Sequence, residues 1–176
     1  IAEVLKPVGY TSKIIGKWHL GAHKETHHAL NRGFDEFYGF LGGSHFYFQK
    51  EMKYQDSYNL TEDREEIEQM RTWILDDHTP VAFEKHLTEE FTDEALDFID
   101  RHQEKPFFLF MSYNAPHTPI QPAKEHLERV AHIQDETRRL YAGLVVGLDD
   151  GVGQIMNKLR ESGLEENTLV FFMSDN

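Results

Sequence analysis

The hydrophobic pattern over the second half of the chain alternates between helical spacing and continuous apolar runs. Between Thr88 and His102 the apolar residues recur at helical spacing, which predicts an amphipathic helix that ends before Lys105-Pro106. Phe107–Met111 is apolar throughout, as is typical of a strand covered on both faces in a mainly parallel sheet. This part of the chain therefore predicts a helix followed by a buried strand.

A longer helix and a second strand are predicted after it. The apolar stripe of this helix consists of Leu140, Leu144, Leu148, Val152, Ile155 and Leu159. Gly163 is a suitable stop for the helix, and Thr168–Met173 predicts a second buried strand. The order helix, strand, loop, long helix, strand indicates an α/β fold, with a mostly parallel or mixed sheet flanked by helices. Such sheets bind their ligands at the carboxyl ends of the strands.

The first half of the chain is less regular. Ile1–Lys6 has the pattern of a helix, and Thr11–Ile15 predicts a short strand that runs into Gly16. Residues 16–43 are dense in glycine, histidine and aromatic residues with little periodicity, which indicates a loop. Residues 50–84 are polar and acidic with one strand near Thr72–Leu75, as in a surface excursion or insertion.

Composition and charge exclude several classes of protein. The chain has 176 residues, a formal charge of −13 and no cysteine, so it has neither a disulfide nor a thiol nucleophile. Residues 51–100 carry sixteen acidic and four basic side chains, which we interpret as a solvated face. This charge would be repelled by nucleic acid and by anionic lipid, and no apolar run approaches the roughly 20 residues of a membrane helix. We therefore expect neither nucleic acid nor a membrane as partner.

Two groups of residues carry candidate acid-base chemistry. Lys17 and His19 are two positions apart after the first predicted strand, so in an extended segment an ammonium and an imidazole would face the same anion. His117 follows the buried strand in a loop whose path is constrained by two prolines, a setting that suits general acid-base catalysis. Each group also has an ordinary interpretation, as a surface lysine or a loop histidine bonded to the backbone.

Two groups could bind metal. Asp175 and Asn176 follow the last predicted strand and offer hard oxygen donors suited to Ca²⁺ or Mg²⁺, although the same pair is common in turns. His19, His23, His27 and His28 lie within ten residues, and the i, i+4 spacing of His23 and His27 would suit zinc on a helix. The glycine before this segment and its lack of apolar periodicity argue against that helix.

Taken together, these groups resemble the sulfatase family of the alkaline phosphatase superfamily. The motifs occur in the family's order: Gly9-Tyr10-Thr11, Gly16–Gly21, Asn31–Asp35, Lys105–Phe108, Asn114–Pro119, Leu148–Gly153 and Asn167–Asn176. The resemblance implies an alkaline phosphatase-like fold, in which residues 1–176 form part of one catalytic domain and residues 50–85 form an excursion from it.

The resemblance also implies roles for individual residues. Lys17 would bind a sulfate oxygen and steady the nucleophile, and His19 would take a proton from the nucleophile when sulfate is expelled. Ser44 would lie beside the sulfate. His117 would hydrogen-bond the ester oxygen and act as general acid toward the leaving alcohol.

The family's cofactor and nucleophile are incomplete in this chain. Asp175 and Asn176 would supply two oxygen ligands to Ca²⁺, and two further aspartate ligands are expected upstream of residue 1. The family uses a formylglycine made within a Cys/Ser-x-Pro/Ala-x-Arg motif, and the chain contains no such motif. A second sulfate-binding lysine is expected beyond residue 176. We therefore expect the chain to be an internal piece of a sulfatase catalytic domain.

The implied activity is hydrolysis of sulfate monoesters in an exported protein, whether periplasmic, extracellular or lysosomal. We favour a carbohydrate sulfate over an aryl sulfate because the aromatic loop Ser44–Phe48 could line a sugar site, although the same loop could serve packing. Two alternatives stay open. One is a phosphatase or phosphodiesterase of the same superfamily with two transition metals. The other is an inert fragment or a degenerate binding protein.

Overall fold

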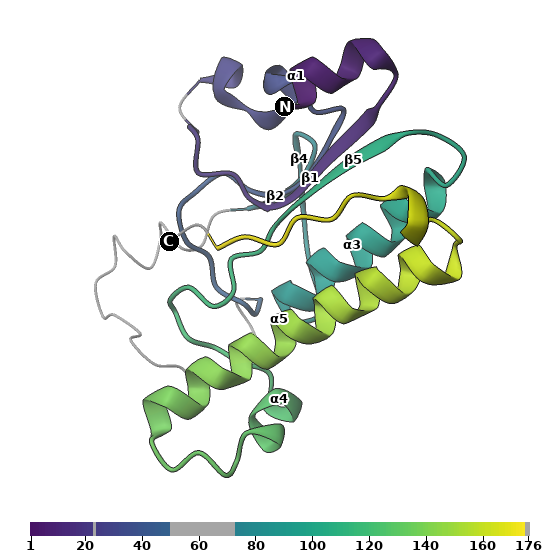
Figure 1. Cartoon of the computed structure of the whole chain (residues 1–176). Helices are drawn as coiled ribbons and strands as arrows, with labels where there is room; N and C mark the ends of the chain where they lie inside the picture. Colours follow the sequence, from purple (N-terminus) through teal and green to yellow (C-terminus); the bar gives the residue numbers. More distant parts are fainter. Residues whose placement is uncertain (23, 50–72, 175–176) are drawn as a thin grey trace.

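The computed structural model describes residues 1–22, 24–49 and 73–174, and its centre is a five-stranded sheet (Figure 1). In sheet order the strands are β4 (Thr79–Val81), β3 (Ile74–Asp76), β2 (Glu36–Phe40), β1 (Thr11–Lys17) and β5 (Phe107–Ser112). Strands β2, β1 and β5 are parallel, whereas β3 and β4 form an antiparallel hairpin beside β2. The sheet is therefore mixed, which confirms the predicted α/β fold.

The helices of the described residues lie on both faces of this sheet (Figure 1). They are α1 (Ala2–Leu5), α3 (Leu87–Arg101), α4 (Lys124–Arg129) and α5 (Glu136–Glu161). Short 3₁₀ turns cover Lys6–Val8, Glu25–His27, Ala29–Arg32 and Glu165–Asn167. The helices predicted near 88–102 and 140–159 are confirmed as α3 and α5. The short helix α4 was not predicted, because its sequence has no clear apolar pattern. No helix of the described residues is long and apolar enough to cross a membrane.

Alternation along the strands divides the core into two clusters. On one face, Ile15 and Tyr38 belong to the cluster that includes the buried residues of α3 and α5. On the other face, Ile14 and Phe37 pack with α1 and the turns around Trp18. Since successive strand residues point to opposite faces, β1 is buried on both sides, as expected for a central parallel strand.

Three glycines let the long helix α5 pack closely against its neighbours. They are buried and lie four residues apart, at Gly143, Gly147 and Gly151. A Cβ atom at Gly143 would lie 2.8 Å from Pro122, and one at Gly151 would lie 2.6 Å from the hydroxyl of Thr92 on α3. The Leu148–Gly153 motif thus includes a residue that sets the distance between α5 and α3.

The sequence did not predict strand β2, because its glycine lies in a glycine-rich stretch that is typical of loops. The segment Gly16–Gly43 was expected to be a loop, but Glu36–Phe40 pairs with β1 over five residues. A Cβ at Gly39 would lie 1.9 Å from the carbonyl oxygen of Gly16, and a Cβ at Gly16 would lie 2.0 Å from that of Ser112. These glycines are therefore required by the close approach of β2, β1 and β5, rather than by a turn.

The predicted strand at Thr168–Met173 is wrong for the described residues. This segment forms no ladder, and Leu169 and Met173 are about four-fifths exposed, at 80% and 81%. An apolar run indicates a preference for burial, but a strand also needs a partner for its backbone groups, and no described strand pairs with it. Strand β5 is accordingly at the edge of the described sheet, and Phe110 is 45% exposed rather than covered.

The excursion expected over residues 50–85 lies mainly outside the described residues. Its described part contains the β3–β4 hairpin, so the strand expected near Thr72–Leu75 is found at Ile74–Asp76. The division of residues 1–176 into a domain and an excursion stays a prediction.

A buried lysine links three elements on one side of the sheet. Lys13 of β1 is 3% exposed, and its Nζ lies 2.8 Å from Oε2 of Glu94 on α3 and 3.4 Å from Oε2 of Glu36 on β2. Arg101, the last residue of α3, donates two hydrogen bonds to Glu36, at 3.0 and 2.7 Å. A buried ammonium is tolerated only when it is paired, and this network pairs it.

We expect the substitution Gly16→Ala to lower the free energy of unfolding by about 2–4 kcal/mol, because a methyl group there collides with backbone and Gly16 has φ +111°. Gly153→Ala is the matched control, since nothing lies within 4 Å of its Cβ position in α5. It should be neutral or stabilise the helix by up to about 1 kcal/mol. Urea unfolding of both variants measures the difference, and equal midpoints would contradict the steric argument.

We expect Glu36 to make stability depend on pH. Burial alone would raise the pKa of Glu36, but hydrogen bonds from Arg101 and the charge of Lys13 lower it on balance below its ordinary 4.5. The stabilisation is therefore complete above pH 4.5 and is lost as the pH falls through the lower folded-state pKa. In urea unfolding at a series of pH values, Glu36→Gln should flatten the decline below pH 4.5. Glu104→Gln, at an exposed turn, should leave it unchanged.

Candidate active site

The three parallel strands end at one edge of the sheet, and the candidate residues follow them. The register pairs Gly16 with Gly39 on one side and with Ser112 on the other, and Lys17 with Phe40. Because parallel strands share their direction, the segments that leave β1, β2 and β5 emerge side by side. The segment at the end of β1 contains Lys17 and His19, the segment after β2 contains Ser44, and the segment after β5 contains His117.

The segment after β1 continues to form backbone hydrogen bonds with β2 and the residue that follows it. The backbone amide of Trp18 donates to the carbonyl of Phe40 at 3.0 Å, and that of His19 donates to Leu41 at 3.3 Å. Lys17 is half-buried, whereas the His19 side chain is exposed and its backbone has a φ of 50°. A left-handed backbone at a residue other than glycine is strained, and such strain concentrates at functional sites.

The histidine of the first segment lies against the second segment. A Cβ at Gly43 would lie 2.7 Å from Nε2 of His19, so the imidazole occupies the space that a side chain at position 43 would need. Gly43 thus brings the loop after β2 against the His19 ring, next to Ser44. The structure places His19 and Ser44 in adjoining segments.

The second segment is bonded to the third. The Ser44 hydroxyl donates to the carbonyl oxygen of Thr118 at 2.6 Å. The same carbonyl accepts from Nδ1 of His117 at 2.8 Å. Ser44 and His117 therefore share one acceptor, so the loop after β2 contacts both His19 and the His117 loop.

The hydrogen bond of His117 sets which ring nitrogen is available for chemistry. A carbonyl oxygen can only accept, so Nδ1 carries the hydrogen and Nε2 is the nitrogen that can take or give a proton. The His117 side chain is exposed, so a reactant can reach Nε2. An imidazolium in this position can donate its Nε2 proton to a leaving oxygen.

A buried tyrosine that sequence reasoning did not single out supports this loop. The Tyr47 hydroxyl lies 3.0 Å from the carbonyl of Asn114 and 2.9 Å from that of His117, both of which can only accept. The amide of Tyr47 donates to Oε1 of Gln121 at 3.0 Å. Tyr47 is fully buried, and burial raises the pKa of its phenol, so it stays a neutral donor.

The aromatic loop Ser44–Phe48 is therefore built mainly for packing. His45, Phe46 and Tyr47 are 4%, 3% and 0% exposed, so their rings face the core rather than a ligand. The sequence could not distinguish a sugar-binding loop from a packing loop, because both use aromatic and polar side chains.

The candidate metal ligands have different outcomes. Asp175 and Asn176 lie outside the described residues, so their placement stays a prediction. His23 also lies outside them, and the helix that zinc would need is replaced near His27 by a 3₁₀ turn. The His28 ring packs against Phe37 and His78, with ring centroids 4.9 and 4.3 Å away. Burial lowers the pKa of His28, as expected for a core histidine.

The Asn31–Asp35 motif has a structural role. Oδ2 of Asp35 accepts from the amide of Ser12 at 2.9 Å and from its hydroxyl at 3.0 Å, which fastens the start of β2 to β1. Phe34 contacts Trp18 edge-on and stacks on Phe108. The motif thus secures the strands whose far ends carry the site.

The chain belongs to the sulfatase family, because the family model described as Sulfatase matches residues 1–176. It is 35% identical over 187 residues to N-acetylgalactosamine-6-sulfatase of Mus musculus, and 36% identical over 186 residues to that of Homo sapiens. Both matches cover 100% of this chain and 32% of the relative. The chain therefore spans about a third of the length of the curated relatives it matches.

Solved structures agree with this assignment. The crystal structure of Ps i-CgsB in complex with k-i-k-neocarrahexaose matches with a TM-score of 0.80 and 32% identity, covering 93% of this chain and 36% of that chain. The structure of BT4656 in complex with D-glucosamine-2-N,6-O-disulfate matches with a TM-score of 0.66 and 17% identity, a likeness of fold.

We expect Tyr47→Phe to destabilise the protein by about 1–2 kcal/mol, because it removes the one hydroxyl hydrogen that two carbonyls of the His117 loop share. Amide hydrogen exchange should become faster at residues 113–118 before the rest of the chain is affected. Tyr141→Phe is the matched control, since Tyr141 is 47% exposed on α5. Unchanged exchange in the loop of Tyr47→Phe would contradict this supporting role.

Proposed function

We propose that the protein containing this chain hydrolyses sulfate monoesters, and that the substrate is a carbohydrate sulfate. The observation that carries the proposal is the meeting of Lys17, His19, Ser44 and His117 in three adjoining segments at one sheet edge. A sulfate ester presents anionic oxygens and a poor leaving alcohol, so its hydrolysis needs positive charge at the oxygens and a proton for the leaving group. A lysine, a hydroxyl and two imidazoles match these needs.

Each residue has a role that its position supports. Lys17, at the end of β1, binds a sulfate oxygen with its ammonium, and Ser44 lies beside the same group. His19 takes a proton from the nucleophile when sulfate is expelled. Nδ1 of His117 bonds to the carbonyl of Thr118, which leaves Nε2 to donate a proton to the leaving alcohol.

The nucleophile and part of the metal site are assigned to other parts of the protein. The chain has no cysteine and no Cys/Ser-x-Pro/Ala-x-Arg motif, so it cannot supply a formylglycine. Asp175 and Asn176 would provide a carboxylate and an amide oxygen, which are donors that Ca²⁺ accepts. When bound, such an ion supplies positive charge that lowers the pKa of the nucleophile and stabilises charge on sulfate oxygens.

The names of the relatives support the choice of a carbohydrate substrate. N-acetylgalactosamine-6-sulfatase is more than a third identical to this chain, whereas arylsulfatase J of Mus musculus is 29% identical. Export of the protein remains part of this proposal.

The sharpest test varies the leaving group. The protein should release sulfate from N-acetylgalactosamine 6-sulfate and from an aryl sulfate, but little phosphate from an aryl phosphate. His117→Ala should lower the rate on the sugar sulfate by about 10²–10⁴-fold and the rate on the aryl sulfate much less, since a phenol leaves without a proton. Lys17→Ala should lower both rates by about 10²–10³-fold.

His132→Ala, an exposed histidine after α4, is the control and should leave both rates unchanged. Equal losses on the two substrates for His117→Ala would refute its role as general acid. Absence of sulfate release from either ester by the full-length wild-type protein would overturn the proposed function, and efficient phosphate release would favour a phosphatase.

A further inference from the structure

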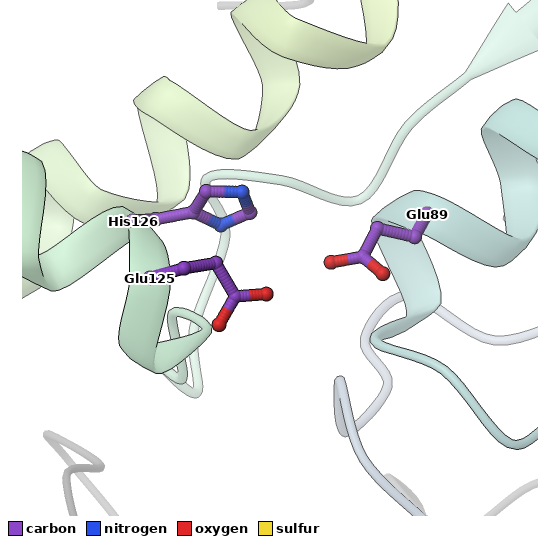
Figure 2. Close-up of side chains that lie close together, drawn as sticks. All are labelled: Glu89, Glu125 and His126. Carbon is purple, nitrogen blue, oxygen red and sulfur yellow. The ribbon is translucent and has the colours of Figure 1, made fainter.

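Away from the sheet edge, three metal-ligating side chains converge between α3 and α4. They are Glu89 in the first turn of α3 and Glu125 and His126 in the first turn of α4, and one ligand atom of each lies within 4.8 Å of the others. Figure 2 shows the two carboxylates and the imidazole turned toward a common space. None of these residues belongs to the catalytic group described above.

The histidine is buried with a nitrogen that lacks a partner. His126 is 7% exposed, and its Nδ1 makes no hydrogen bond among the described residues. Its Nε2 lies 3.7 Å from Oδ2 of Asp150 on α5, and a ring nitrogen faces the carboxylates of Glu125 and Glu89 (Figure 2). Metal-ligating histidines commonly have a carboxylate near the second ring nitrogen, and Asp150 lies near Nε2 of His126 here.

The surroundings hold the imidazole in place. A Cβ at Gly147 of α5 would lie 2.8 Å from Nδ1 of His126, so a glycine at this position makes room for the ring. His86, which caps α3, bonds through Nε2 to the carbonyl of Gln121 at 2.9 Å. This bond joins the start of α3 to the residues that lead into α4, so Glu89 and His126 are presented by connected elements.

The nearby cations are committed to other acids. Lys85 pairs with Asp93 and Arg129 pairs with Asp150, and Lys13 pairs with Glu94 and Glu36. In the described part of the chain, neither Glu89 nor Glu125 has a lysine or arginine partner. Two carboxylates in one space repel each other unless a cation lies between them.

We propose that Glu89, Glu125 and His126 bind a divalent cation of the zinc type, which links α3 to α4. One imidazole nitrogen and two carboxylate oxygens suit zinc, whereas Ca²⁺ prefers oxygen ligands throughout. A tetrahedral zinc holds its ligand atoms about 3.3 Å apart. The ligand atoms all lie within 4.8 Å of one another, so each pair needs to close by no more than roughly 1.5 Å, which small changes of side-chain torsion can supply.

The test measures zinc directly, without reference to catalysis. The protein is equilibrated with Zn²⁺ in the presence of excess Ca²⁺, which occupies oxygen-only sites, and zinc per chain is determined by elemental analysis. We expect wild type to hold one more zinc than Glu125→Gln and His126→Gln, or to bind it about tenfold or more tightly. The thermal midpoint of wild type should also rise with Zn²⁺, and those of the two variants should not.

Glu128→Gln and His132→Gln are matched controls on the same stretch, because both residues are exposed and lie outside the cluster. They should retain the zinc of wild type. Since Glu125 is exposed, its variant keeps the fold even where His126→Gln does not. Equal zinc content and equal affinity in wild type and Glu125→Gln would overturn the proposal, whatever the sulfate-releasing activity of the protein.

Discussion

The close approach of three parallel strands at Gly16 and Gly39 is the constraint on which the rest of the structure depends. The carbonyls of Gly16 and Ser112 occupy the positions where side chains would otherwise lie. This contact sets the register of β2, β1 and β5, so their carboxyl ends stop at the same level. The segments at the ends of the three strands therefore leave the sheet side by side. They contain Lys17, Ser44 and His117. The register matters because a shift of one residue would turn the side chains of a strand to the other face of the sheet.

The loops at this edge are held by buried polar groups rather than by their own secondary structure. Tyr47 reaches two carbonyls of the His117 loop, and Gln121 accepts the amide of Tyr47. His86 joins Gln121 to the start of α3. These buried hydrogen bonds connect loops that no described strand pairing connects. The loop that carries the exposed His117 is therefore held by hydrogen bonds from the buried Tyr47.

Charge is arranged differently in the two regions discussed above. At the sheet edge, Lys17 is half-buried and His19 and His117 are exposed, and these side chains suit an anionic ester. Between α3 and α4, two glutamates face a buried histidine, which suits a cation. The chain carries a net charge of −13, whereas Lys17 contributes a positive charge at this edge.

Much about this protein was determined by the sequence alone. The helices near α3 and α5, strands β1 and β5, the α/β class and the sulfatase family follow from patterns that are local or motif-like. The tertiary structure decided what depends on contacts between distant segments. Strand β2 was hidden because Gly39 serves a close approach, and the run at residues 168–173 forms no described strand because a strand requires a partner. Tyr47, Glu89 and His126 acquire their roles only through residues far away along the chain.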